Sequence, residues 1–287
     1  MIGLGAKYLT AAGFGRYRIT AASLGNLDLL GTLSWLKDAT KAAILGAFRD
    51  DGMAVINATN DYLNGIAASD RDKATALAGF INEDPMMVCS LGLQPQGVDM
   101  PIRWLVNNGA AYIDTGFVPT NQTSIDTVYN ATSSNCYVYG SAIDYSNRTM
   151  EQYGTELHFG VYKGGLSGLY GAVVHLWSNV TQYYWTNNGN NYSTSFGAYS
   201  GTFPYTMGLF ALHRASWLAS SGKIKMNYYK MSIGGSDVRN MVPFESGKQG
   251  IGMVDLVGME FHEKLGSGSF TIEYTLPDGT PWTPSTP

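Results

Sequence analysis

The sequence predicts a mainly β protein, a β-sandwich with a small α-helical region at its N-terminus. From Lys223 to Ile233 apolar and polar residues alternate, which is typical of strands with one buried face. From residue 96 onward, clusters of Gly, Asn and Ser recur about every ten residues, the spacing of turns in an all-β sandwich. The composition agrees, because 35 Gly and 19 Tyr with only 14% charged residues suit a protein of turns and aromatic surface.

Residues 1–95 form the predicted N-terminal region, an arm followed by three short helices. We expect the helices at Ser34–Phe48, at Met53–Asn64 and from Ser69 to just before Pro85. The third is marked most clearly, because Ser69 and Asp72 have capping-box spacing before an apolar stripe. The stripes are mostly alanine and bury little apolar surface. We therefore expect this region to contact other subunits.

Residues 96–276 form the predicted sandwich, and the Pro-rich residues 277–287 form an extended tail. The apolar run Met86–Leu93 before it reads as a further strand. Asn108-Gly109 predicts a hairpin between the first two strands, and the phase change at Tyr228-Tyr229 predicts a β-bulge. The strands are expected at Ile102–Val106, around Tyr112, and at Ser124–Tyr129, Tyr137–Ile143, Leu157–Tyr162, Ala172–Trp177, Met207–Leu212, Lys223–Ile233, Val238–Phe244, Ile251–Leu256, Met259–His262 and Phe270–Tyr274.

Several of these segments resemble concanavalin A-like (LamG-type) jelly-roll domains. Ala111–Phe117 resembles the "YIDTG" strand that opens such a domain, and Gly252-Met253-Val254-Asp255 and Gly266–Phe270 are similar to later segments. The resemblance covers about Pro101 to Tyr274 and implies a concanavalin A-like jelly-roll sandwich. Such domains are common in proteins of gut bacteria and their phages. They serve as lectins, hydrolases and structural modules, so the fold alone does not assign a function.

Charge and hydropathy exclude two classes of partner. A net charge of −4 and a pI near 5.5 offer no basic surface for nucleic acid. No run approaches the roughly 18 apolar residues of a membrane span. No secretory signal is visible at the N-terminus. We therefore expect a protein made in a host cytoplasm that reaches its place by assembly.

The sequence offers no enzyme. A glycoside hydrolase of this fold would resemble laminarinases, which carry E-x-D-x-x-E along one strand so that carboxylates flank the scissile bond. That run is missing, and on a strand Glu260 and Glu263 would face opposite sides. The histidines at 158, 175, 213 and 262 are far apart in sequence. Three of them lie in predicted strands among apolar residues, and there we expect hydrogen-bonded core residues rather than metal ligands. No catalytic residue, metal or cofactor is predicted.

The segment from residue 183 to residue 192 is the candidate ligand site. Sugar sites need aromatic rings that stack on a pyranose and amides that bond its hydroxyls. This segment has both, and Trp185 has the largest ring. An equally weighted interpretation is a hairpin whose Asn-Gly turn joins cross-strand aromatic pairs. The predicted ligand-binding residues are Tyr183, Tyr184, Trp185, Asn187, Asn188, Asn190, Asn191 and Tyr192.

Together these features predict a non-enzymatic structural protein of a phage virion, a head or tail fibre or appendage. Its lectin-like sandwich would contact the host surface or a cell-surface glycan. Its N-terminal region would join other virion subunits in a homo-oligomer, for example a trimer. The alternatives are a stand-alone bacterial carbohydrate-binding module and a glycoside hydrolase of the same fold.

Overall fold

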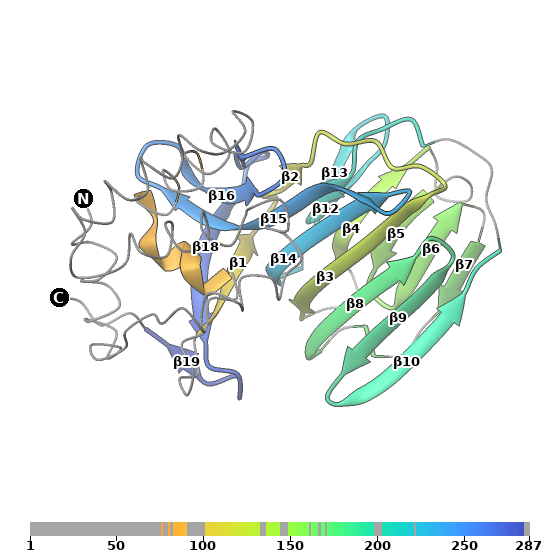
Figure 1. Cartoon of the computed structure of the whole chain (residues 1–287), viewed down its shortest axis with the longest axis horizontal. Coiled ribbons are helices and arrows are strands. Elements are labelled where there is room, and N and C mark those ends of the chain that lie inside the picture. Colours follow the sequence, from red (N-terminus) through yellow and green to blue (C-terminus); the bar gives the residue numbers. More distant parts are fainter. Residues whose placement is uncertain are drawn as a thin grey trace, which may run out of the picture. The chain divides into compact units, whose positions relative to one another are not determined.

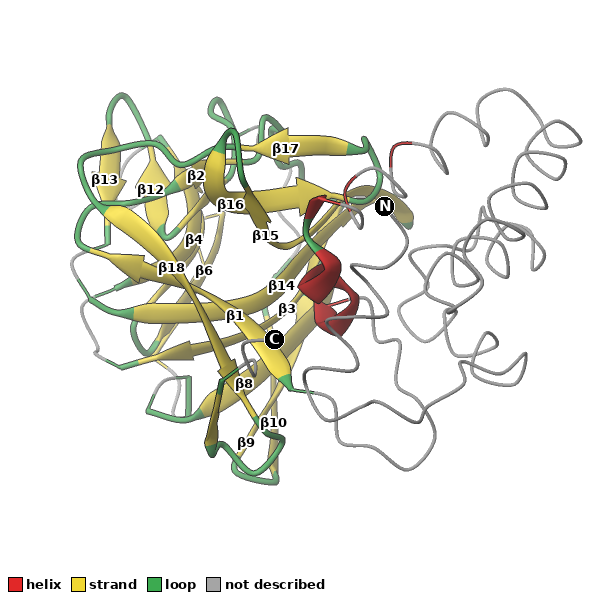
Figure 2. Cartoon of the chain, turned by 90° about the vertical axis from the view of Figure 1, so that its left-hand side faces the viewer, coloured by secondary structure: helices red, strands yellow, loops and turns green. Residues whose placement is uncertain are grey.

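The computed structural model describes residues 76, 80, 83–90, 101–132, 136–143, 149–160, 162–165, 168–169, 171–197, 203–220 and 222–283. Strands dominate this part of the chain, as Figure 2 shows, so the prediction of a mainly β protein is confirmed. The first two predicted helices lie outside the described residues.

The end of the third predicted helix is described. Ala76, Phe80 and Glu83 are helical, and the amide of Asp84 donates to the carbonyl of Phe80 at 2.8 Å. Proline at position 85 has no amide hydrogen, so the helix ends before it, as predicted. The predicted strand at Met86–Leu93 is wrong over its described residues, because a 3₁₀ helix, η3, occupies Pro85–Ser90. Periodicity does not separate a short buried helix from a short buried strand.

The described chain divides into two compact units. Unit 1 contains residues 1–103, 244–248 and 273–287, and unit 2 contains residues 104–243 and 249–272. The predicted regions 1–95 and 277–287 both fall in unit 1.

Unit 1 is held by a few specific contacts among its described residues. The Arg103 guanidinium lies 2.6 Å from the Asp84 carboxylate, and both side chains are buried. Asp84 also accepts the amide of Glu245 at 2.8 Å, and Phe80 packs edge-on against Phe244 with ring centroids 5.3 Å apart. Among the described residues, no helix combines the length and hydropathy needed to cross a membrane.

The first sheet of unit 2 has neighbouring strands in the order β10-β9-β8-β3-β14-β1, and each strand for which a register is given pairs antiparallel (Figure 1). β15, β16 and β17 extend it from β14. The bounds are β1 Ile102–Asn108, β3 Thr123–Ala131, β8 Val173–Asn179, β9 Gln182–Asn187, β10 Asn190–Ser195, β14 Ile224–Ile233, β15 Ser236–Ser246, β16 Gly250–Asp255 and β17 Glu260–His262.

The second sheet follows the order β13-β12-β4-β5-β6-β7, with β11 between β2 and β4. Its pairs are antiparallel except for β12 with β4, which are parallel. In unit 1, β18 pairs with β19 at Tyr274 and Trp282. The bounds are β2 Ile113–Asp114, β4 Tyr137–Ala142, β5 Thr149–Tyr153, β6 Glu156–Gly160, β7 Tyr162–Gly165, β11 Gly208–Leu209, β12 Ala211–His213, β13 Trp217–Ala219, β18 Ser269–Thr275 and β19 Pro281–Trp282.

The core of unit 2 is a single buried cluster to which both sheets contribute. β3 alternates buried and half-buried residues along its whole length, as a strand with one covered face should. Rings meet between the sheets, Tyr139 with Tyr229 at 6.0 Å and Phe159 with Tyr183 at 6.4 Å. The arrangement is that of two β-sheets packed around one apolar interior.

Two local predictions have opposite outcomes. The predicted bulge is confirmed, because the register of β14 against β3 shifts between Met226 and Tyr228. The predicted hairpin at Asn108-Gly109 is wrong, because β1 pairs with β14 while β2 pairs with β11 in the other sheet. The buried Asn107 explains the difference. Its side chain donates to the carbonyl of Gly222 and accepts the amide of Ile224, so it anchors the end of β1 to the start of β14.

Candidate functional site

The predicted ligand segment is a regular hairpin formed by β9 and β10. Six residue pairs join the strands, from Asn190 opposite Asn187 to Ser195 opposite Gln182. The turn residues Asn188 and Gly189 have φ angles of 50° and 75°, the two left-handed positions that a type I′ turn requires. The hairpin interpretation of this segment is therefore the one that the structure shows.

One face of the hairpin belongs to the core. Tyr183 and Trp185 are 1% and 2% exposed and lie in the apolar cluster. Tyr192, directly opposite Trp185, stacks on it with ring centroids 5.5 Å apart and planes 7° from parallel. Trp185 thus has the core position that competed with a binding role, and its ring is not available for stacking on a sugar.

The predicted amides are divided between the core and the tip of the hairpin. Asn187 is buried, and its amide donates to the carbonyl of Gly168 at 2.6 Å. Asn188, Asn190 and Asn191 are exposed in the turn and at the start of β10. The asparagines therefore do not surround Trp185 as one site.

The outward face of the same hairpin carries Tyr184, which is half-buried. On β8 its direct partner is Trp177, and the two rings stack at 5.7 Å with planes 18° apart. The His175 ring lies 4.8 Å from the Trp177 ring. On β10 the residue opposite Tyr184 is Ser193, which is exposed and whose side chain is too short to cover the tyrosine ring. These rings form an aromatic row on the outer face of the first sheet.

A carboxylate held by two donors continues the row. Asp126 of β3 is the partner of Trp177, and its Oδ1 lies 2.9 Å from Nε2 of His175 and 2.6 Å from the hydroxyl of Tyr228. Because a carboxylate only accepts, the tyrosine hydroxyl donates to it, and the imidazole does so through a protonated Nε2. Burial first, and then the neighbouring Asp126 charge, raise the pKa of Tyr228 well above its usual value, so the phenol remains a donor.

Asp126 keeps an open oxygen. Its side chain is 41% exposed, and among the described residues only Oδ1 receives hydrogen bonds. Oδ2 is thus an acceptor of fixed orientation beside an aromatic pair. Aromatic rings and an oriented polar group on one surface are the elements with which proteins bind sugars. We define the outer-face site as Asp126, His175, Trp177, Tyr184 and Tyr228.

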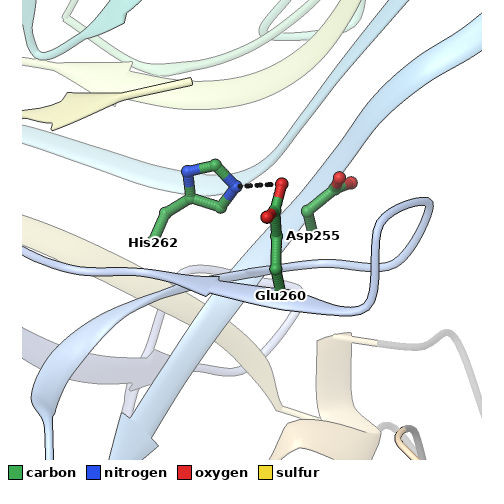
Figure 3. A group of neighbouring side chains, drawn as sticks. All are labelled: Asp255, Glu260 and His262. Carbon is green, nitrogen blue, oxygen red and sulfur yellow. Dashed lines mark ion pairs between the residues drawn. The ribbon is translucent and has the colours of Figure 1, made fainter. Parts of the chain in front are cut away.

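A second group of polar side chains, Asp255, Glu260 and His262, brings three metal-ligating types together (Figure 3). Nε2 of His262 lies 3.3 Å from Oε1 of Glu260, close enough for an ion pair but not aligned as a hydrogen bond. Its Nδ1 lies 3.0 Å from the carbonyl of Asp114, so Nδ1 carries the proton that it donates.

The bonds of Asp255 argue against a metal centre. The carboxylate is fully buried, and Oδ1 accepts the amides of Asn240 and Val257, while Oδ2 accepts the amide of Gly258 and Nη1 of Arg239. A cation would have to displace these donors and stand beside a guanidinium. The group is better described as an ion-pair network that holds the turn between β16 and β17.

Arg239 connects this network to the segment that resembles "YIDTG". Its Nε donates to the carbonyl of Thr115 at 2.6 Å, and Nη2 lies 3.3 Å from Oε1 of Glu260. The guanidinium also lies over the Phe117 ring, 5.0 Å from its centroid. The motif residues therefore have structural roles at this place.

Two histidines, His175 and His262, lie in surroundings that the sequence-based expectation missed. His175 was expected in the core, but its side chain is 42% exposed. Its neighbours Val174 and Leu176 are fully buried, so the period of two along β8 places His175 and Trp177 outward. The outward position of His175 could have been predicted from this alternation in the sequence. The grouping of His262 with Asp255 and Glu260 depends on the pairing of β16 with β17.

Comparison with known proteins adds no family assignment. The sequence matches no protein-family model, and no curated protein sequence is significantly similar to it. The functional interpretation therefore depends on the geometry of unit 2.

Proposed function

We propose that this chain is a non-enzymatic carbohydrate-binding protein and that saccharide binds at the outer-face site. The observation that carries the proposal is the row formed by Tyr184, Trp177 and the half-exposed Asp126 with its open Oδ2. A pyranose ring packed against Tyr184 would bring its hydroxyls within reach of polar groups on neighbouring strands. The proposed site therefore lies on the outer face of the hairpin rather than around Trp185. Of the ligand-binding residues predicted from the sequence, it keeps Tyr184.

We further propose the setting that the sequence resemblance implies. The sandwich would be of the concanavalin A-like jelly-roll type, and the protein would be a head or tail fibre or appendage of a phage virion. Residues 1–95 would join it to other subunits as an oligomer, and the sandwich would face the host surface. Support for this setting comes from the resemblance and from the alanine-striped helices expected in the N-terminal region.

Two matched tyrosines test the binding site. Tyr184 and Tyr192 are both half-buried and lie in the same hairpin, but Tyr184 faces outward while Tyr192 packs on Trp185. On a glycan microarray probed with the full chain, Tyr184→Ala should abolish binding and lower the melting temperature only slightly, through loss of its cross-strand pair with Trp177. Tyr192→Ala should lower the melting temperature and retain binding. Glycan binding that survives Tyr184→Ala and Trp177→Ala would refute the site.

A further inference from the structure

The surface around Tyr184 carries no charge on two adjacent strands. The outward positions of β9 and β10 follow from their register, in which Tyr184 faces Ser193 and Thr186 faces Asn191. None of these outward side chains belongs to an acidic or basic residue. The outward residues are Gln182, Tyr184, Thr186, Asn191, Ser193 and Ser195.

Among the described residues, the cations nearest to the row are already compensated or distant. Lys230, opposite Asp126 on β14, lies with its Nζ 2.9 Å from Oδ2 of Asp237. Lys225 lies opposite Asn130, four residues along β3 from Asp126. At roughly 3.4 Å per residue this is about 14 Å, beyond the Debye length of about 8 Å at physiological salt. A positive charge on His175 would face the Asp126 carboxylate directly.

With a neutral His175, the only formal charge in the outer-face site is the negative charge of Asp126. Asp126 can accept hydrogen bonds from sugar hydroxyls through Oδ2, but it repels another carboxylate. Among the described residues at this site, an anionic sugar would find no cation to replace the water that it loses.

We infer that the outer-face site selects neutral saccharides and rejects anionic ones, such as glycans that end in sialic or uronic acids. This inference rests on the proposed function of the same site. The sugar ring would stack on Tyr184, and its hydroxyls would donate hydrogen bonds to the Asp126 carboxylate. Charge exclusion supplies the selectivity.

The test compares neutral glycans with their sialylated counterparts on one microarray, with the full chain as the probe. Repulsion between two unit charges about 4 Å apart in water predicts that added sialic acid weakens binding about fivefold or more. The difference should shrink as salt concentration rises. Equal or stronger binding of the sialylated glycans would overturn the inference while leaving the proposed function intact.

Two variants at different positions test the charge effect, so the conclusion does not depend on a single substitution that could disturb the fold. Asp126→Asn removes the charge. The ratio of the affinities for neutral and sialylated glycans should then fall toward one, at some loss of affinity for neutral glycans. Ser193→Lys places a cation on the exposed strand β10 beside Tyr184 and should shift the preference toward sialylated glycans. If neither variant changes the ratio, the inference is wrong. If no glycan gives a signal that depends on Tyr184, the proposed function fails, and this inference with it.

Discussion

Trp185→Ala and Trp177→Ala should have very different effects on stability, although the two residues lie on neighbouring strands of one sheet. Trp185 is 2% exposed and stacks on Tyr192 in the core. Replacing a buried tryptophan by alanine removes its transfer free energy and leaves a cavity, at a cost of about 3–5 kcal/mol. In a domain of this size each kcal/mol lowers the melting temperature by about 2–4 °C, so a loss of about 6–20 °C is expected.

Trp177 is the matched control. It is half-buried on the outer face, and its contact with Tyr184 is a cross-strand pair worth about 0.5–1.5 kcal/mol. Urea unfolding followed by far-UV circular dichroism measures both variants against the wild-type chain. A Trp185→Ala midpoint within error of wild type, or equal losses for both variants, would refute the assignment of the two faces.

Three further predictions concern stability. Gly266→Ala should cost at least about 2 kcal/mol, because a Cβ there would lie 2.1 Å from the carbonyl oxygen of Ala110 at a φ of 80°. Gly235→Ala, with nearly the same φ and open space, should cost only about 1 kcal/mol, and equal costs in urea unfolding would contradict the close approach. Arg239→Met should destabilise by about 3 kcal/mol, because it leaves the buried Asp255 charge without its guanidinium. Lys230→Met, which breaks a half-exposed pair, should cost less than about 1 kcal/mol by the same assay. Burial raises the pKa of Tyr129, Tyr183 and Tyr229 above 10, so the folded state holds protons that the unfolded state releases. Stability is then complete below about pH 10 and falls above it by up to about 1.4 kcal/mol per pH unit for each tyrosine; Tyr183→Phe should reduce this slope, and an unchanged slope would contradict the burial of its phenol.

The strands were predictable where one face is buried and the other polar. Lys223–Ile233 alternates clearly, and β14 with its bulge lies there. The hairpin of β9 and β10 was ambiguous for a physical reason. Tyr183, Tyr184 and Trp185 are consecutive and all aromatic, so alternation of polarity does not tell which face is covered.

Contacts between distant segments were not predictable from local pattern. Asn108-Gly109 has the composition of a hairpin turn. However, the hydrogen bonds of Asn107 to Gly222 and Ile224 join the end of β1 to β14 instead of to the next strand. Likewise, Asp126, His175 and Tyr228 meet because β3 pairs with both β8 and β14. Sequence pattern places each of these residues on a strand, while only the sheet order brings them together.

Fluorine NMR of the full chain labelled with fluorotryptophan tests the central claim most directly. The chain has six tryptophans, and the Trp177 signal can be assigned as the one missing from Trp177→Phe. Titration with a neutral oligosaccharide identified on the microarray should shift the Trp177 signal saturably and leave the Trp185 signal unchanged. A saturable shift of another tryptophan with no change at Trp177 would contradict a saccharide site on the outer face.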